Sequence, residues 1–127
     1  MLGETGVTPM IAVKDLDRAR KFYKETLGLS GGKAIGGEVV EMKSGDTTIS
    51  VYKSEFAGTN KATALTFDVD DIRQEVSELK EKGVLFEHYD LPGLKKEGDI
   101  YTADGMKTAW FKDPDGNILS LLEGNGG

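Results

Sequence analysis

Apolar and polar residues alternate on both sides of a sharp turn near the end of the chain. The segment Trp110–Glu123 reads WFKDPDGNILSLLE, and its centre, 113–117, combines Asp, Pro, Gly and Asn as tight turns do. Alternation places Trp110 and Ser120 on one face of the two flanking strands and mainly aliphatic residues on the other. The pattern predicts a β-hairpin with one face packed on a helix and the other able to line a cavity.

Two segments have the apolar spacing of amphipathic helices. They cover 16–27 and 72–82, and in each case an Asp precedes the helix and a Gly follows it. Short apolar runs predict strands at 7–13, 38–43, 47–53, 60–69 and 84–89. The remaining segment, 90–105, is long for a connection, and we expect it to be a functional loop that carries Tyr101.

The order strand, helix and three strands occurs twice along the chain. VKDL opens the first helix much as VDDI opens the second, and GDTTISV in the first copy parallels DGNILSL in the second. One such unit cannot bury its apolar face alone, so two copies are expected to pair. We therefore expect a single domain over 1–127, made of module 7–53 and module 62–123 joined by 54–61.

Composition narrows the classes of function. The net charge of −6, without a basic tract, argues against a nucleic-acid partner, and the absence of Cys removes disulfides, thiolate zinc sites and cysteine nucleophiles. No apolar run approaches the ~20 residues that cross a bilayer, and the opening MLGETGVTP lacks the regions of a signal peptide. We expect a cytoplasmic protein with no membrane partner.

The repeated βαβββ unit, the VKDLDRARKFYKETLGL helix and the final WFKDPDGNILSLLE together resemble the vicinal oxygen chelate superfamily. This superfamily includes glyoxalase I, extradiol dioxygenases and bleomycin-resistance proteins. The resemblance covers Val7 to Glu123. It implies an α+β fold in which two βαβββ modules form an eight-stranded, cup-shaped mixed sheet, with helices outside and ligands inside the cup.

The enzymes of the superfamily hold a divalent metal with His and Glu side chains from the first, fourth, fifth and eighth strands. The resemblance places those positions at Thr8, Ser50, Ala64 and Ser120. Hydroxyls and a methyl cannot replace imidazoles and carboxylates as ligands, so no metal or other cofactor is expected. The sole histidine, His88, is interpreted as a surface or hydrogen-bonded residue of the sixth strand.

If these four positions face the cup, alternation places further small, hydroxyl-bearing and aromatic residues beside them, which is typical of a pocket. The predicted ligand-binding residues are Trp110, Tyr52, Ser50, Ser120, Thr8, Thr66 and Tyr101. The leading hypothesis is a metal-independent small-molecule binding protein of the bleomycin-resistance type that sequesters a planar or cationic ligand. The alternatives are a glyoxalase-like lyase or dioxygenase with a non-standard active site, and a scaffold whose cup is filled. In each case we expect a homodimer.

Overall fold

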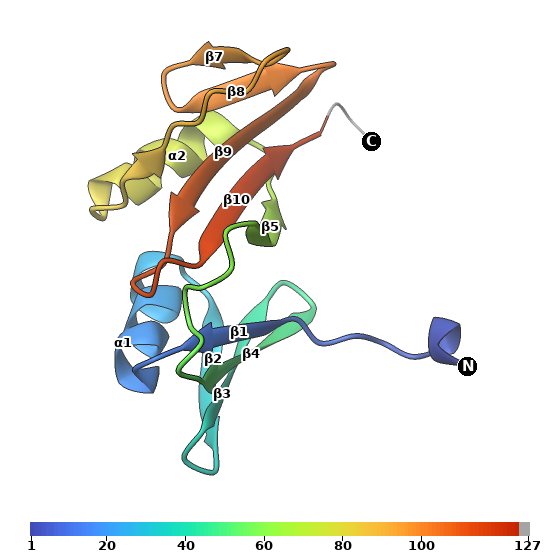
Figure 1. Ribbon diagram of the computed structural model, residues 1–127, viewed down its shortest axis with the longest axis vertical. Helices are drawn as coiled ribbons and strands as arrows, with labels where there is room; N and C mark the ends of the chain where they lie inside the picture. The colour runs from blue at the N-terminus through green and yellow to red at the C-terminus, as the bar shows by residue number, and fades with distance from the viewer. Residues whose placement is uncertain (125–127) are drawn as a thin grey trace. The chain divides into compact units, whose positions relative to one another are not determined.

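The computed structural model describes residues 1–124, and the chain divides into two compact units, the first at Met1–Thr59 and the second from Asn60 onward (Figure 1). The boundary between Thr59 and Asn60 lies within the connection that the sequence indicated. Each unit has its own sheet and its own helix. No helix among the described residues is long and apolar enough to span a bilayer.

The first unit has one helix on one face of a four-stranded sheet. Its strands follow the order β1-β4-β3-β2, with β1 parallel to β4 and the other neighbours antiparallel. The helix packs on β3 and β4. Its elements are η1 (Leu2–Glu4), β1 (Met10–Val13), α1 (Leu16–Lys21), the π-helical turn η2 (Phe22–Thr26), β2 (Ser30–Ile35), β3 (Val39–Ser44) and β4 (Thr47–Lys53).

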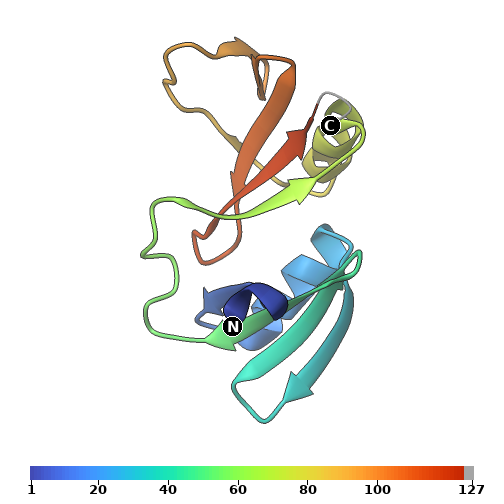
Figure 2. The same cartoon turned by 90° about the vertical axis from the view of Figure 1, so that its right-hand side faces the viewer.

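The second unit repeats this plan with an extended sheet. Its strands follow the order β5-β10-β9-β8-β7, with β5 parallel to β10, and β6 and β8 pair with different parts of β9. Figure 2 shows α2 to the right of β9 and β10, while the chain leading into β7 loops out to the left. Its elements are β5 (Thr63–Asp68), α2 (Ile72–Glu81), β6 (Phe86–Glu87), β7 (Lys95–Glu97), β8 (Ile100–Ala103), β9 (Met106–Lys112) and β10 (Ile118–Glu123).

Both helices begin as the sequence predicts. The Asp15 carboxylate accepts hydrogen bonds from the backbone N–H groups of Asp17 and Arg18, at 3.0 and 3.1 Å. The Asp71 carboxylate accepts one from Gln74 N–H at 3.2 Å. These bonds satisfy N–H groups that the first turn of a helix leaves without a partner.

The turn after β9 fixes the register of the last hairpin. Asp113 Oδ1 accepts hydrogen bonds from the backbone N–H groups of Asp115 and Asn117, both at 2.9 Å, and Asp113 Oδ2 accepts one from the Asn117 amide at 2.8 Å. The resulting register pairs Trp110 with Ser120. The intervening residues Ala109, Phe111, Leu119 and Leu121 are buried. The predicted division of this hairpin into two faces is confirmed.

The α+β fold with βαβββ modules and helices packed on mixed sheets is confirmed. Two local predictions are wrong. The segment 90–105 is not a loop, because it contains β7 and β8. The first strand does not start at Val7: it begins at Met10, and Thr8 lies exposed before it.

Candidate ligand-binding site

A cavity of about 400 Å³ opens on one face of the sheet in the second unit. Strand pairing places Tyr101 beside Thr108, Trp110 beside Ser120, and Ser120 beside Thr66, so these side chains share a face. The buried Phe111 and Leu119 belong to the opposite set of positions, in the strands on which α2 packs. The cavity is lined by Thr63, Thr66, Leu94, Tyr101, Ala103, Asp104, Met106, Thr108, Trp110, Ser120 and Leu122.

Trp110 is fixed by three neighbours. Its ring makes edge-to-face contacts with Tyr89 and Tyr101, with centroid distances of 5.5 and 5.2 Å. Its indole Nε1–H donates a hydrogen bond to Thr63 Oγ1 at 3.2 Å. The aromatic pairs and the hydrogen bond restrict the orientation of the indole, so the cavity has a preformed aromatic wall.

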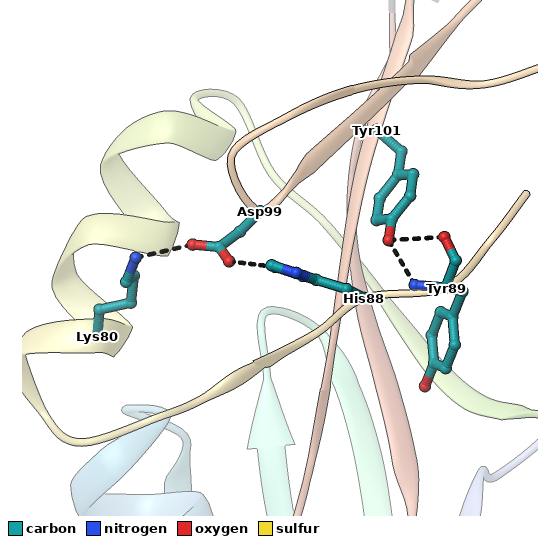
Figure 3. Close-up of polar contacts among 5 residues, drawn as sticks. All are labelled: Lys80, His88, Tyr89, Asp99 and Tyr101. Atoms are coloured by element: carbon teal, nitrogen blue, oxygen red, sulfur yellow. Dashed lines mark hydrogen bonds and ion pairs between the residues drawn. The ribbon is translucent and has the colours of Figure 1, made fainter.

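Tyr101 lies in β8 and is 2% exposed, so the prediction that it belongs to a functional loop is wrong. Its hydroxyl accepts a hydrogen bond from Tyr89 N–H at 2.5 Å and donates one to Tyr89 C=O at 3.0 Å (Figure 3). Both bonds hold the chain after β6 against β8. The ring of Tyr101 lines the cavity, while its hydroxyl is already occupied.

Unlike the hydroxyl of Tyr101, the hydroxyl of Tyr89 is buried without a hydrogen-bond partner among the described residues. Burial raises the pKa of this phenol, and the negative charge of Glu87 raises it further. The Tyr89 ring therefore serves as an apolar support for Trp110.

A charged network holds the β7–β8 turn in place. Asp99 accepts a hydrogen bond from Lys80 Nζ at 2.8 Å, and its other oxygen lies 2.7 Å from His88 Nε2 (Figure 3). The bond from Lys80, and then the one from His88, hold the pKa of Asp99 below its usual value. The network joins α2, the chain after β6 and the turn before β8. His88 is thus a hydrogen-bonded residue, as the sequence indicated, although it follows β6 instead of lying within it.

Thr63 reaches the cavity because the pairing of β5 and β10 slips by one residue. Ile118 pairs with Thr63, whereas Leu119 pairs with Leu65, so Ala64 is skipped. A β-bulge of this kind interrupts the strict alternation of side chains. The sequence pattern assigned Ala64 to the pocket face, but Thr63 lines the cavity there.

Two further hydrogen bonds organise the floor of the cavity. Thr66 Oγ1 and Ser120 Oγ lie 2.8 Å apart, and Thr108 donates its hydroxyl hydrogen to the carbonyl oxygen of Leu121 at 2.9 Å. Ser120 is only 3% exposed. Of the predicted site residues, Trp110, Ser120, Thr66 and Tyr101 are therefore brought together in one cavity.

The other three predicted residues belong to the first unit. Ser50 lies in the middle of β4, pairs with Met10 and is buried, while Tyr52 is half-buried beside Ala12. A role for Ser50 and Tyr52 in ligand binding stays a prediction. Thr8 precedes β1 and is exposed, so the alternation along a strand that predicted its place in the pocket does not apply to it.

The donor set does not fit a divalent metal site of the kind that the superfamily's enzymes use. Ser120 already pairs with Thr66, Ser50 offers a neutral hydroxyl and Ala64 a methyl. Among residues 1–124 no three His, Cys, Asp or Glu side chains lie close enough together to bind a metal ion.

The described chain has two βαβββ modules, and the second carries a cavity on one face of its sheet. The chain belongs to the Glyoxalase/Bleomycin resistance protein/Dioxygenase superfamily, whose family model matches residues 7–121. A comparison with curated proteins finds no match.

Several solved structures share the fold at low sequence identity. A glyoxalase family protein from Enterococcus faecalis is 22% identical with a TM-score of 0.72, over 97% of this chain and 100% of that one. Lactoylglutathione lyase from Agrobacterium tumefaciens is 18% identical with a TM-score of 0.70, over 95% and 94%. TnmS3, an antibiotic binding protein from Streptomyces sp. CB03234, is 21% identical with a TM-score of 0.61, over 95% and 98%. At these identities the likeness shows the fold alone, because one fold carries several functions.

Proposed function

We propose that this protein binds a planar small molecule in the cavity of its second unit and holds it without metal-dependent chemistry. The observation that carries the proposal is the fixed Trp110 ring, supported by Tyr89, Tyr101 and Thr63 at the wall of a cavity of about 400 Å³. Cavities of this size suit small ligands, and a preorganised aromatic wall lowers the cost of ordering side chains on binding.

The polar groups of the cavity favour binding over catalysis. Among the described residues, the aliphatic hydroxyls that line it belong to Thr63, Thr66, Thr108 and Ser120, and the charged lining residue, Asp104, lies exposed in the turn between β8 and β9. Neutral aliphatic hydroxyls without an adjacent base are poor nucleophiles and poor proton donors. A protein with such a cavity can sequester a ligand, and the structural neighbour TnmS3 is an antibiotic binding protein.

The proposal is tested by screening planar aromatic compounds against the fluorescence of Trp110, the sole tryptophan. Saturable quenching or a spectral shift is expected for at least one compound class. Isothermal titration calorimetry then compares Trp110→Ala with the unmodified protein, and the variant should lose about 1–3 kcal/mol of binding free energy. Trp110→Phe is the matched control: because it keeps a ring, it should retain part of the affinity. If both variants bind as tightly as the unmodified protein, Trp110 is not part of the site.

A further inference from the structure

We propose that the cavity selects its planar ligand through an uncharged oxygen acceptor, such as a ring carbonyl, and not through a positive charge. This inference rests on the proposed function and names the ligand class of the same site. It depends on which hydroxyl hydrogens at the cavity are already donated in hydrogen bonds within the protein.

Thr63 offers a free hydrogen-bond donor. The indole Nε1–H of Trp110 can only donate, so Thr63 Oγ1 is the acceptor of the 3.2 Å bond between them. The hydroxyl hydrogen of Thr63 is not used in that bond. It has no other partner among the described residues and lies at the cavity wall beside the indole.

The pair formed by Thr66 and Ser120 offers a second free donor. Their oxygens lie 2.8 Å apart, and a single hydrogen atom occupies the line between them. Whichever residue donates, the hydroxyl hydrogen of the other is left over. Ser120 is 3% exposed, so bulk water has poor access to that end of the pair.

The other two hydroxyls at the cavity add no donor. Thr108 gives its hydrogen to the carbonyl oxygen of Leu121, and Tyr101 gives its hydrogen to the carbonyl oxygen of Tyr89. The cavity therefore has free donors at Thr63 and at the Thr66–Ser120 pair. Thr63 and Thr66 are exposed, so water can accept these hydrogens in the free protein. A ligand that displaces this water leaves the donors unpaired unless it offers an acceptor.

The charges around the cavity do not favour a buried cation. Asp104 is the only charged residue lining it within residues 1–124, and it is exposed in the turn between β8 and β9. Glu87, whose backbone pairs with that of Trp110, does not line the cavity and forms an ion pair with Lys112 at 3.3 Å. A cation that entered the cavity would lose its hydration without gaining a paired carboxylate, which is costly.

The test compares three planar probes by equilibrium dialysis: 9-fluorenone, fluorene and the cationic dye proflavine. Fluorenone and fluorene differ by a carbonyl in place of a methylene. The carbonyl should make fluorenone bind about 5- to 30-fold more tightly than fluorene, because one or two donors gain a partner. Proflavine should bind more weakly than fluorenone.

Three variants assign the preference to named donors. Thr63→Val should reduce the fluorenone-to-fluorene ratio, and so should the double variant Thr66→Val/Ser120→Ala, because either hydroxyl of the pair alone would still leave one free hydrogen. Thr63→Ser should restore the ratio because it keeps the hydroxyl. Thr102→Val is the matched control: Thr102 neighbours Tyr101 on β8, does not line the cavity, and should leave the ratio unchanged. Circular dichroism and thermal melts of each variant confirm that it is folded.

The outcomes separate the two proposals. If none of the three probes binds, both the proposed function and this inference are overturned. If fluorenone and fluorene bind equally well through Trp110, the binding function stands and the acceptor preference is wrong. If proflavine binds most tightly and loses that advantage in Asp104→Asn, the site selects a cation, which also overturns the inference.

Discussion

Removing one hydroxyl from either of two neighbouring tyrosines should affect stability very differently. Tyr101 and Tyr89 both pack edge-to-face on Trp110, and Phe at either position keeps that ring contact. The Tyr101 hydroxyl makes two hydrogen bonds to the backbone of Tyr89, whereas the Tyr89 hydroxyl is buried without a partner within residues 1–124. The same chemical change therefore removes two bonds in one case and none in the other.

The expected magnitudes follow from these contacts. Each net hydrogen bond is worth about 0.5–1.5 kcal/mol, so Tyr101→Phe should lower the free energy of unfolding by about 1–3 kcal/mol. In a domain of this size the melting temperature should fall by roughly 3–5 °C for each kcal/mol lost. Tyr89→Phe should change stability by less than about 0.5 kcal/mol or raise it, because it removes a buried polar group without a partner.

Urea unfolding followed by Trp110 fluorescence measures both variants, since the indole lies beside the two rings. Tyr89→Phe is the internal control for the loss of a phenolic hydroxyl. If the two variants are equally destabilised, the hydroxyl of Tyr101 does not hold the chain after β6 as the structure indicates. The preformed wall of the cavity would then lack its main support.

Three other outcomes are expected. Lys80 and then His88 hold the pKa of Asp99 below its ordinary 3.8. The stability that Asp99 contributes should therefore be complete above that value and be lost as the pH falls through its lower folded-state pKa. In Asp99→Asn the free energy of unfolding should depend less on pH in this acid range than it does in the unmodified protein. If the two acid-unfolding curves are the same, Asp99 does not contribute this stability. Since β1 and β5 are edge strands of their sheets, light scattering should report a homodimer of twice 13.7 kDa; a monomer at micromolar concentration would contradict this. Added Ni, Zn, Mn or Fe should not raise the melting temperature, and elemental analysis should not find about one metal per chain after dialysis.

Local signals in the sequence were sufficient for much of the fold. Asp15 and Asp71 each precede an apolar stripe and cap a helix, because a short carboxylate can reach the free N–H groups of the first turn. The Asp113 turn fixes one hairpin register, and this places Trp110 and Ser120 on the same face. These predictions succeed since each depends on residues close together in the chain.

The hairpin that carries Tyr101 was missed although a signal was present. Asp104 and Gly105 adopt positive φ angles of 52° and 79°, and an Asp-Gly pair is a strong indicator of a two-residue hairpin turn. The segment before it is charged and lacks clear alternation, because all three residues of β7 are exposed. A hairpin turn at this Asp-Gly pair requires a strand on each side of it, and Tyr101 lies in the strand before the turn.

Other parts of the site depend on contacts between distant segments. Thr63 enters the cavity only because the pairing of β5 with β10 skips Ala64. No local sequence pattern predicts this β-bulge. The bond between Thr66 and Ser120 joins residues 54 positions apart. Thr8 falls outside the first strand because that strand begins only at Met10, after Pro9, which has no N–H to donate to a sheet.

The most direct test of ligand binding follows the indole N–H resonance of Trp110 by NMR during a titration with 9-fluorenone. The protein has one tryptophan and so gives one indole cross-peak, whose proton contacts Thr63 at the cavity wall. We expect this peak to shift saturably, together with the backbone amides of Thr63 and Ser120. If the compound binds while the indole peak stays in place, the ligand occupies another site and the assignment of this cavity is wrong.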